Sequence, residues 1–148
     1  MLPYAHLLIG LIVSGGLYFI FPEIDLLKAG ILLASSVLID FDHYLFYMFN
    51  KKGLSLKKAY NWFSERKKKH KKLTKEQRKA FPIIPSIFHG MEWIVLFFVL
   101  GFFTTSLFYF VAFGMLLHLI TDWGEHLEHP GRLNKISMIY DIFKYRKE

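Results

Sequence analysis

The sequence contains no cysteine, and this absence narrows the chemistry that the chain can perform. Disulfide bonds, thiolate metal sites and cysteine nucleophiles are all excluded. A serine hydrolase is not indicated either, because no serine, histidine and acid are spaced in a way that predicts a catalytic triad. A metal site in this chain would therefore be expected to use imidazole and carboxylate groups.

Charged residues are scarce outside one segment, and the rest of the chain is strongly apolar. Hydrophobic residues make up 53% of the sequence, and 16 residues are phenylalanine. A soluble domain of 148 residues could not bury so much apolar surface. We therefore expect one all-α domain, covering residues 1–148, that is embedded in a membrane.

Four apolar runs are long enough to cross a bilayer, which needs about 20 residues and accepts about 17. They cover residues 4–21, 26–49, 83–103 and 106–123, and the last helix is expected to continue to residue 129. Short turns separate the first two runs and the last two. Since short connections produce antiparallel neighbours, the sequence predicts an integral membrane four-helix bundle built from two antiparallel helical hairpins.

The first apolar run is expected to be retained as a membrane helix. It begins with no basic leader before it. The segment Phe21-Pro22-Glu23 that follows it is not a small-residue cleavage site.

Residues 51–82 form a basic loop between the two hairpins. This loop holds 13 of the 19 lysine and arginine residues, opposed only by Glu65 and Glu76. The positive-inside rule places such a segment in the cytoplasm. Both ends of the chain are then cytoplasmic too, and the protein is predicted to be a multi-pass protein of the cell (inner or plasma) membrane.

The basic loop is expected to be helical. Ser55 is predicted to cap a helix that starts at Leu56, and Thr74 and Gln77 match a capping box for a second helix. A basic amphipathic helix on the inner leaflet would contact membrane lipids, with anionic head groups as expected partners. A nucleic-acid partner is not expected, because the loop lacks a DNA-binding motif.

All four expected spans bring histidine or acidic residues to the cytoplasmic side. In chain order these residues are His6, Asp40, Asp42, His43, His89, Glu92, His118 and Asp122. The pairs at helical spacing are Asp40 with His43, His89 with Glu92, and His118 with Asp122. Each pair would share a helix face. A charge in the apolar zone costs at least about 2.5–3.5 kcal/mol, which a bound cation would offset.

These eight residues are therefore predicted to ligate one or two divalent ions, zinc first, with manganese or iron as alternatives. Simpler interpretations also exist. His6 would be an interfacial histidine, and Asp40 and Asp42 would be acids at a helix end. His89 and Glu92 would pair with each other or with the basic loop, and His118 and Asp122 would form a hydrogen-bonded pair between helices. Further along the fourth run, Glu125, His126 and His129 would either orient the ligands or be solvated.

The same residues resemble a known group of proteins. His6, the Asp40-x-Asp42-His43 motif, a histidine opening the third helix and His118-x-x-x-Asp122 occur in this order in the YdjM-like family of membrane-bound hydrolases, which are described as metal-dependent. The resemblance covers most of the chain apart from the basic loop. At the third site the family often has a His-Arg-Gly-x-x-His-Ser segment. This chain has His89-Gly90-Met91-Glu92-Trp93, so Glu92 stands where a second histidine is expected.

The predicted function is hydrolysis of an ester or phosphoester, with a lipid as one candidate substrate, by metal-activated water at the cytoplasmic interface. Glu92 would be a ligand or the general base, and Asp42 would bridge to a second metal. Two alternatives remain open. Intramembrane acids and histidines also mark metal or proton transporters, and a non-catalytic scaffold would use the same groups to join helices.

Overall fold

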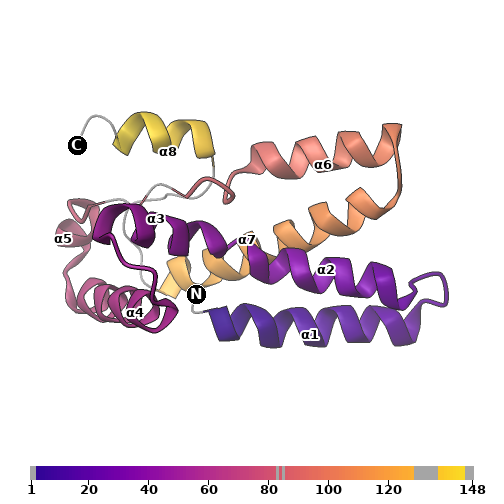
Figure 1. The fold of residues 1–148 in the computed structure, drawn as a ribbon, viewed down its shortest axis with the longest axis horizontal. Helices are drawn as coiled ribbons and strands as arrows, with labels where there is room; N and C mark the ends of the chain where they lie inside the picture. Colours follow the sequence, from indigo (N-terminus) through magenta and orange to yellow (C-terminus); the bar gives the residue numbers. More distant parts are fainter. Residues whose placement is uncertain (1–2, 83, 85, 129–136, 146–148) are drawn as a thin grey trace.

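The computed structural model describes residues 3–82, 84, 86–128 and 137–145. Within these ranges the regular elements are all helices (Figure 1). They are α1 (Pro3–Ile20), α2 (Leu26–Leu38), α3 (Phe41–Lys51), α4 (Leu56–Lys72), α5 (Lys75–Lys79), α6 (Met91–Phe103), α7 (Leu107–Glu128) and α8 (Met138–Tyr145). The prediction of an all-α protein is confirmed.

Three of the described segments are long and apolar enough to cross a membrane. They are Pro3–Ile20, Leu26–Lys51 and Leu107–Gly124. Large apolar side chains are exposed on the outer face of α1, where Ile12 and Phe19 are 66% and 86% exposed. Apolar side chains exposed along a whole helix face are expected to contact lipid. The structure therefore supports a membrane protein.

The second apolar run forms two helices, where the sequence predicted one helix over residues 26–49. At the junction the amide of Asp40 donates to Val37 O, and that of Asp42 donates to Ile39 O, both at 3.3 Å. These i to i−3 bonds tighten the backbone locally. Aspartate favours such junctions because its short polar side chain competes for backbone hydrogen bonds. This tight turn changes the direction of the chain at Asp40, before α3 begins.

The third run begins its helix later than the predicted residue 83. Residues 84 and 86–90 are not helical, and α6 starts at Met91. Two prolines, Pro82 and Pro85, lack the amide hydrogen that a helix needs and disfavour helical geometry in the residue before them. With 13 residues, α6 is about 20 Å long, shorter than the roughly 30 Å hydrocarbon core. As a result His89 lies on the segment before α6.

The helices pack through α2, which contacts α1 on one side and α7 on the other, while α6 packs against α7 (Figure 1). Small residues allow the close approach of α2 and α7. A Cβ atom on Gly114 would lie 1.9 Å from Ser35 Oγ and 2.4 Å from Leu32 O. Interfaces between membrane helices commonly use such small residues. This contact fixes the second half of α2 beside the first half of α7.

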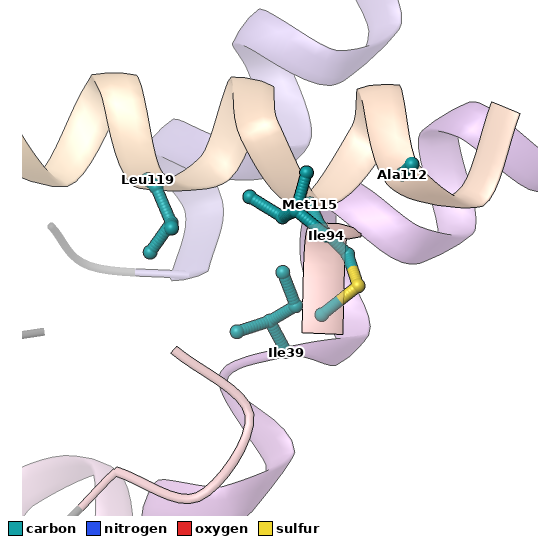
Figure 2. Close-up of a cluster of buried hydrophobic side chains, with 5 residues drawn as sticks. All are labelled: Ile39, Ile94, Ala112, Met115 and Leu119. Atoms are coloured by element: carbon teal, nitrogen blue, oxygen red, sulfur yellow. The ribbon is translucent and has the colours of Figure 1, made fainter. Parts of the chain in front are cut away.

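The buried apolar core lies where α2, α6 and α7 meet. Figure 2 shows Ile39, which directly follows α2, together with Ile94 of α6 and Met115 of α7, gathered along α7. Leu119, one turn further along α7, is completely buried in the same cluster. Two members of the core are sequence neighbours of residues in the polar cluster: Ile39 directly precedes Asp40, and Leu119 directly follows His118. The core therefore supports the polar cluster described below.

The basic loop is largely helical, as predicted. Ser55 Oγ accepts a hydrogen bond from the amide of Lys58, and the capping box between Thr74 and Gln77 is formed. Arg66 ties α4 to the segment after α5, because its guanidinium lies 4.4 Å from the Phe81 ring centre and donates to Pro82 O. Burial lowers the pKa of Arg66, which nevertheless stays charged at neutral pH.

Candidate metal centre

Four segments that are distant in sequence bring histidine and aspartate side chains to one buried cluster. The first turn of α1 provides His6, the junction after α2 provides Asp40, the segment before α6 provides His89, and α7 provides His118 and Asp122. We call these five residues the His/Asp cluster. His89 and His118 are completely buried, and His6 is 2% exposed. The predicted convergence of all four runs is thus observed.

The Nε2 atoms of the three histidines face the two carboxylates. His118 Nε2 lies 3.6 Å from Asp40 Oδ1 and 3.7 Å from Asp122 Oδ2. His89 Nε2 lies 3.5 and 3.8 Å from the same two oxygens. His6 Nε2 lies 3.4 Å from Asp122 Oδ1 and 3.9 Å from Asp40 Oδ2. The cluster therefore presents nitrogen and oxygen atoms to a common centre.

The outward nitrogens of two of these histidines donate hydrogen bonds. His118 Nδ1 lies 2.8 Å from the carbonyl oxygen of Ser36, which can only accept. His89 Nδ1 lies 2.9 Å from a carboxylate oxygen of Asp42. A neutral imidazole with its hydrogen on Nδ1 carries a lone pair on Nε2. Both rings therefore turn Nε2 lone pairs inward.

His6 is oriented in the same way by Thr121. His6 Nδ1 lies 2.8 Å from Thr121 Oγ1, and this hydroxyl donates to His118 O at 2.7 Å. Because the hydroxyl hydrogen is used on the carbonyl, the hydroxyl oxygen accepts from His6 Nδ1. His6 Nε2 has no hydrogen-bond partner among the described residues. Its lone pair is thus available inside the cluster.

This arrangement has the properties of a metal site. His89 Nε2 and His118 Nε2 are 3.0 Å apart, so two inward lone pairs would repel unless a proton or a cation lies between them. Metal-ligating histidines usually donate their other ring nitrogen to a carboxylate or carbonyl, as these do. Two ligands about 2.0–2.1 Å from a tetrahedral zinc ion lie about 3.3 Å apart, close to the separations found here.

Asp42 lies behind the histidines, where it orients them. Its carboxylate accepts from His89 Nδ1, from His43 Nδ1 and from the amide of Phe88 at 3.1 Å. Both of its oxygens are engaged by these donors. In this structure Asp42 orients the two histidines, and its predicted role as a ligand bridging a second metal stays a prediction.

His43 borders the His/Asp cluster and is more exposed than the three histidines of the cluster. Its side chain is 22% exposed and stacks on His89 and Phe63, with ring centres 4.9 and 5.3 Å apart. Ligand atoms of Asp40, His43 and His89 lie within 4.8 Å of one another, as do those of His6, His118 and Asp122. His43 is therefore placed to act beside the cluster, as a further ligand or as a proton acceptor.

Glu92 belongs to neither of these groups. Its carboxylate accepts hydrogen bonds from Ser137 Oγ and from the amides of Met138 and Ile139, at the start of α8. The predicted pairing with His89 fails because α6 begins at Met91, so the two residues do not share a helix face. In this structure Glu92 holds the start of α8, and its predicted roles as ligand or general base stay predictions.

Thr121 and Ser36 are the site residues that sequence reasoning missed. Thr121 lies three residues after His118, on the helix face already identified, and this spacing could have indicated it. Ser36 contributes its backbone carbonyl, which no side-chain pattern predicts. The side chains of Glu125 and His126, and all of His129, lie outside the described part of the chain, so their suggested roles stay predictions.

Comparison with known proteins gives no further guidance on this site. No family model, curated protein or solved structure matches the chain. What the chain does must therefore be inferred from the buried His/Asp cluster and from its place in an apolar helical protein.

Proposed function

We propose that this protein is a membrane-embedded, metal-dependent hydrolase with His6, Asp40, His89, His118 and Asp122 as metal ligands. The supporting observation is that three buried imidazoles each use Nδ1 on an outer partner and turn Nε2 toward two carboxylates. Zinc is the expected ion, with manganese or iron as alternatives, because imidazole and carboxylate ligands suit these metals. The number of ions is one or two.

The proposed membrane arrangement has α1, α2 with α3, α6 and α7 as spans, forming two antiparallel hairpins. In it, the short α6 would be accommodated by thinning of the bilayer or by its neighbours. The basic helices α4 and α5 would lie on the cytoplasmic side of the cell membrane. Both ends of the chain would lie there too, and anionic lipid head groups would contact the basic loop.

A divalent cation at the cluster would act as a Lewis acid and lower the pKa of water toward about 7. The chain's own residues supply the rest. Asp40 and Asp122 balance the positive charge in a site with little solvent. Asp42 accepts from His43 Nδ1, so the Nε2 lone pair of His43 points away from Asp42. We assign His43 as the proton acceptor in place of Glu92.

The resemblance to the YdjM-like family supports the hydrolase class in this proposal. Its motif residues Asp40, Asp42 and His43, with His118 and Asp122, all lie in or against the His/Asp cluster. At the third site His89 alone serves as ligand, because Glu92 is engaged with α8. The substrate class is an ester or phosphoester at the membrane surface.

Metal analysis combined with hydrolysis assays tests this proposal. We expect the purified protein to contain a divalent metal and to hydrolyse an aryl ester or an aryl phosphodiester. Chelation should abolish the reaction, and added metal should restore it. His118→Ala should lose both metal and activity. His70→Ala is the matched control, since His70 contacts Phe81 edge-on in the basic loop and its loss should leave both unchanged.

Two results would contradict the proposal. A metal-free protein whose stability is unaffected by chelators would indicate a structural role for the cluster. Metal uptake into proteoliposomes without hydrolysis would instead support a transporter.

A further inference from the structure

An apolar groove lies between α2, α6 and α7. Its volume is about 240 Å³, and it is open on one side. Its lining includes Ser35, Ile39, Phe88, Phe97, Val111 and Met115. All three helices contribute, and α7 forms the floor because it packs against both α2 and α6.

The polar groups of the residues that line the groove are already engaged, and the indole N–H of Trp93 donates to Ile87 O at 2.8 Å. Ser35 is its one hydroxyl-bearing residue, and Ser35 Oγ donates within the helix to Ile31 O at 2.8 Å. The same oxygen also lies 3.1 Å from Leu32 O and 3.4 Å from Phe110 O. The hydroxyl is therefore satisfied by backbone carbonyls. An occupant of the groove would be held by apolar contact alone.

Three residues that line the groove are close neighbours in the chain of residues of the His/Asp cluster. Ile39 directly precedes Asp40, and Phe88 directly precedes His89. Met115 lies one helical turn before His118 on α7. The junction after α2, the segment before α6 and α7 each contribute to both the groove and the cluster, so a molecule lying in the groove would lie close to the proposed metal.

The surroundings of the groove define its occupant. Two of its walls belong to segments long and apolar enough to cross a membrane, so its open side would face acyl chains and not water. A volume of about 240 Å³ is below the roughly 300–1,000 Å³ of pockets that enclose a whole small molecule. It therefore suits part of one chain.

From this juxtaposition we infer that the groove binds an acyl chain of a membrane lipid and presents the ester or phosphoester of that lipid to the His/Asp cluster. The inference rests on the proposed hydrolase function and specifies its substrate class. The lipid enters from the bilayer between α2 and α6. Its chain lies over Val111 and Met115, and its head group stays at the membrane surface beside the basic loop.

Photolabelling tests the groove without relying on catalysis. The protein is reconstituted in phosphatidylethanolamine and phosphatidylglycerol vesicles that contain a phospholipid with a diazirine on its acyl chain, and labelled residues are identified by mass spectrometry. We expect label on Met115, which is only 6% exposed, as well as on exposed Leu8 of α1. Val111→Trp fills the groove and should reduce the label on Met115 several-fold, with that on Leu8 unchanged.

The matched control is Ile12→Trp, which adds the same side chain on the exposed face of α1 and should leave labelling of Met115 unchanged. Retained metal content shows that Val111→Trp is folded. Phe97→Ala, which widens the groove, should keep Met115 labelled. Label confined to exposed residues, or label on Met115 that Val111→Trp does not reduce, would overturn the inference.

Activity gives a second readout that separates the two proposals. Val111→Trp should raise KM for a long-chain aryl ester at least about tenfold, the equivalent of losing two buried methylene contacts, and leave hydrolysis of an aryl acetate unchanged. Equal effects on both esters would contradict an acyl-binding groove. If no ester is hydrolysed but Met115 is labelled, the groove stands and the hydrolase proposal fails.

Discussion

Two histidine–acid pairs have helical spacing in the sequence, but only one of the pairs meets in the folded structure. His118 and Asp122 are four residues apart and meet in the cluster, because α7 is continuous through both. His89 and Glu92 are three residues apart and separate, because α6 begins between them. Helical spacing therefore predicts a shared site only where the helix spans both residues.

The two residues of the separated pair, His89 and Glu92, have different structural roles. His89 turns inward, held by Asp42, while Glu92 holds the first turn of α8. Gly90 makes this possible, since a Cβ there would lie 2.1 Å from Glu92 Oε2 and 2.8 Å from the amide nitrogen of Met138. The segment before α6 thus serves the cluster with one residue and the C-terminal helix with the other.

The largest loss of metal affinity is expected from Asp122→Asn, which alters the His118–Asp122 pair. The substitution keeps the shape of the side chain but removes one of two carboxylates from a buried site. Metal affinity should fall more than the roughly 10–100-fold caused by losing an outer partner. Competitive titration with a chromogenic chelator measures this. Wild-type affinity in Asp122→Asn would exclude Asp122 as a ligand.

A smaller effect is expected from Asp42→Asn, which weakens the orientation of His89. Asp42 accepts from two histidines and one amide, and an amide side chain cannot accept all three. Metal affinity should fall roughly 10–100-fold while the metal still binds at saturating concentration. The same chelator titration applies. A loss as complete as that of Asp122→Asn would mean that Asp42 is itself a ligand.

Thr121→Val should have a weaker effect again. It removes the hydroxyl that accepts from His6 Nδ1 and keeps the side-chain shape. A neutral hydrogen bond contributes about 0.5–1.5 kcal/mol, so affinity should fall by up to about tenfold. Thr121→Ser, which keeps the hydroxyl, should restore it. If both variants bind metal like the wild type, His6 is oriented by something other than Thr121.

Glu92→Gln should leave metal affinity unchanged, because Glu92 serves α8. Replacing the carboxylate weakens its hydrogen bonds to the start of that helix, which should loosen α8. Limited proteolysis near residue 137 should become faster, with metal content as the control. A loss of metal in Glu92→Gln would restore the original prediction that this residue is a ligand.

The sequence predicted the helical class, the apolar runs and most of the cluster. Long apolar runs predict helices directly, and the four runs together supplied the histidines and aspartates that meet in the cluster. Local backbone detail was harder to predict. The junction at Asp40 and the late start of α6 depend on aspartate and proline acting against an otherwise apolar helical pattern.

The supporting contacts were less predictable than the ligands. Asp42 reaches His89 across 47 residues of sequence, and His118 reaches the Ser36 carbonyl across 82. Such partners depend on how α2, α7 and the segment before α6 pack together. No local spacing encodes them, so a predicted ligand and a predicted orienting residue could not be told apart.

X-ray absorption spectroscopy of the metal-loaded protein tests the central claim most directly. The account predicts a first coordination shell of nitrogen and oxygen with the outer-shell scattering of at least two imidazole rings, which decreases in His118→Ala. A shell made only of oxygen, without imidazole scattering, would contradict the assignment of His6, His89 and His118 as ligands.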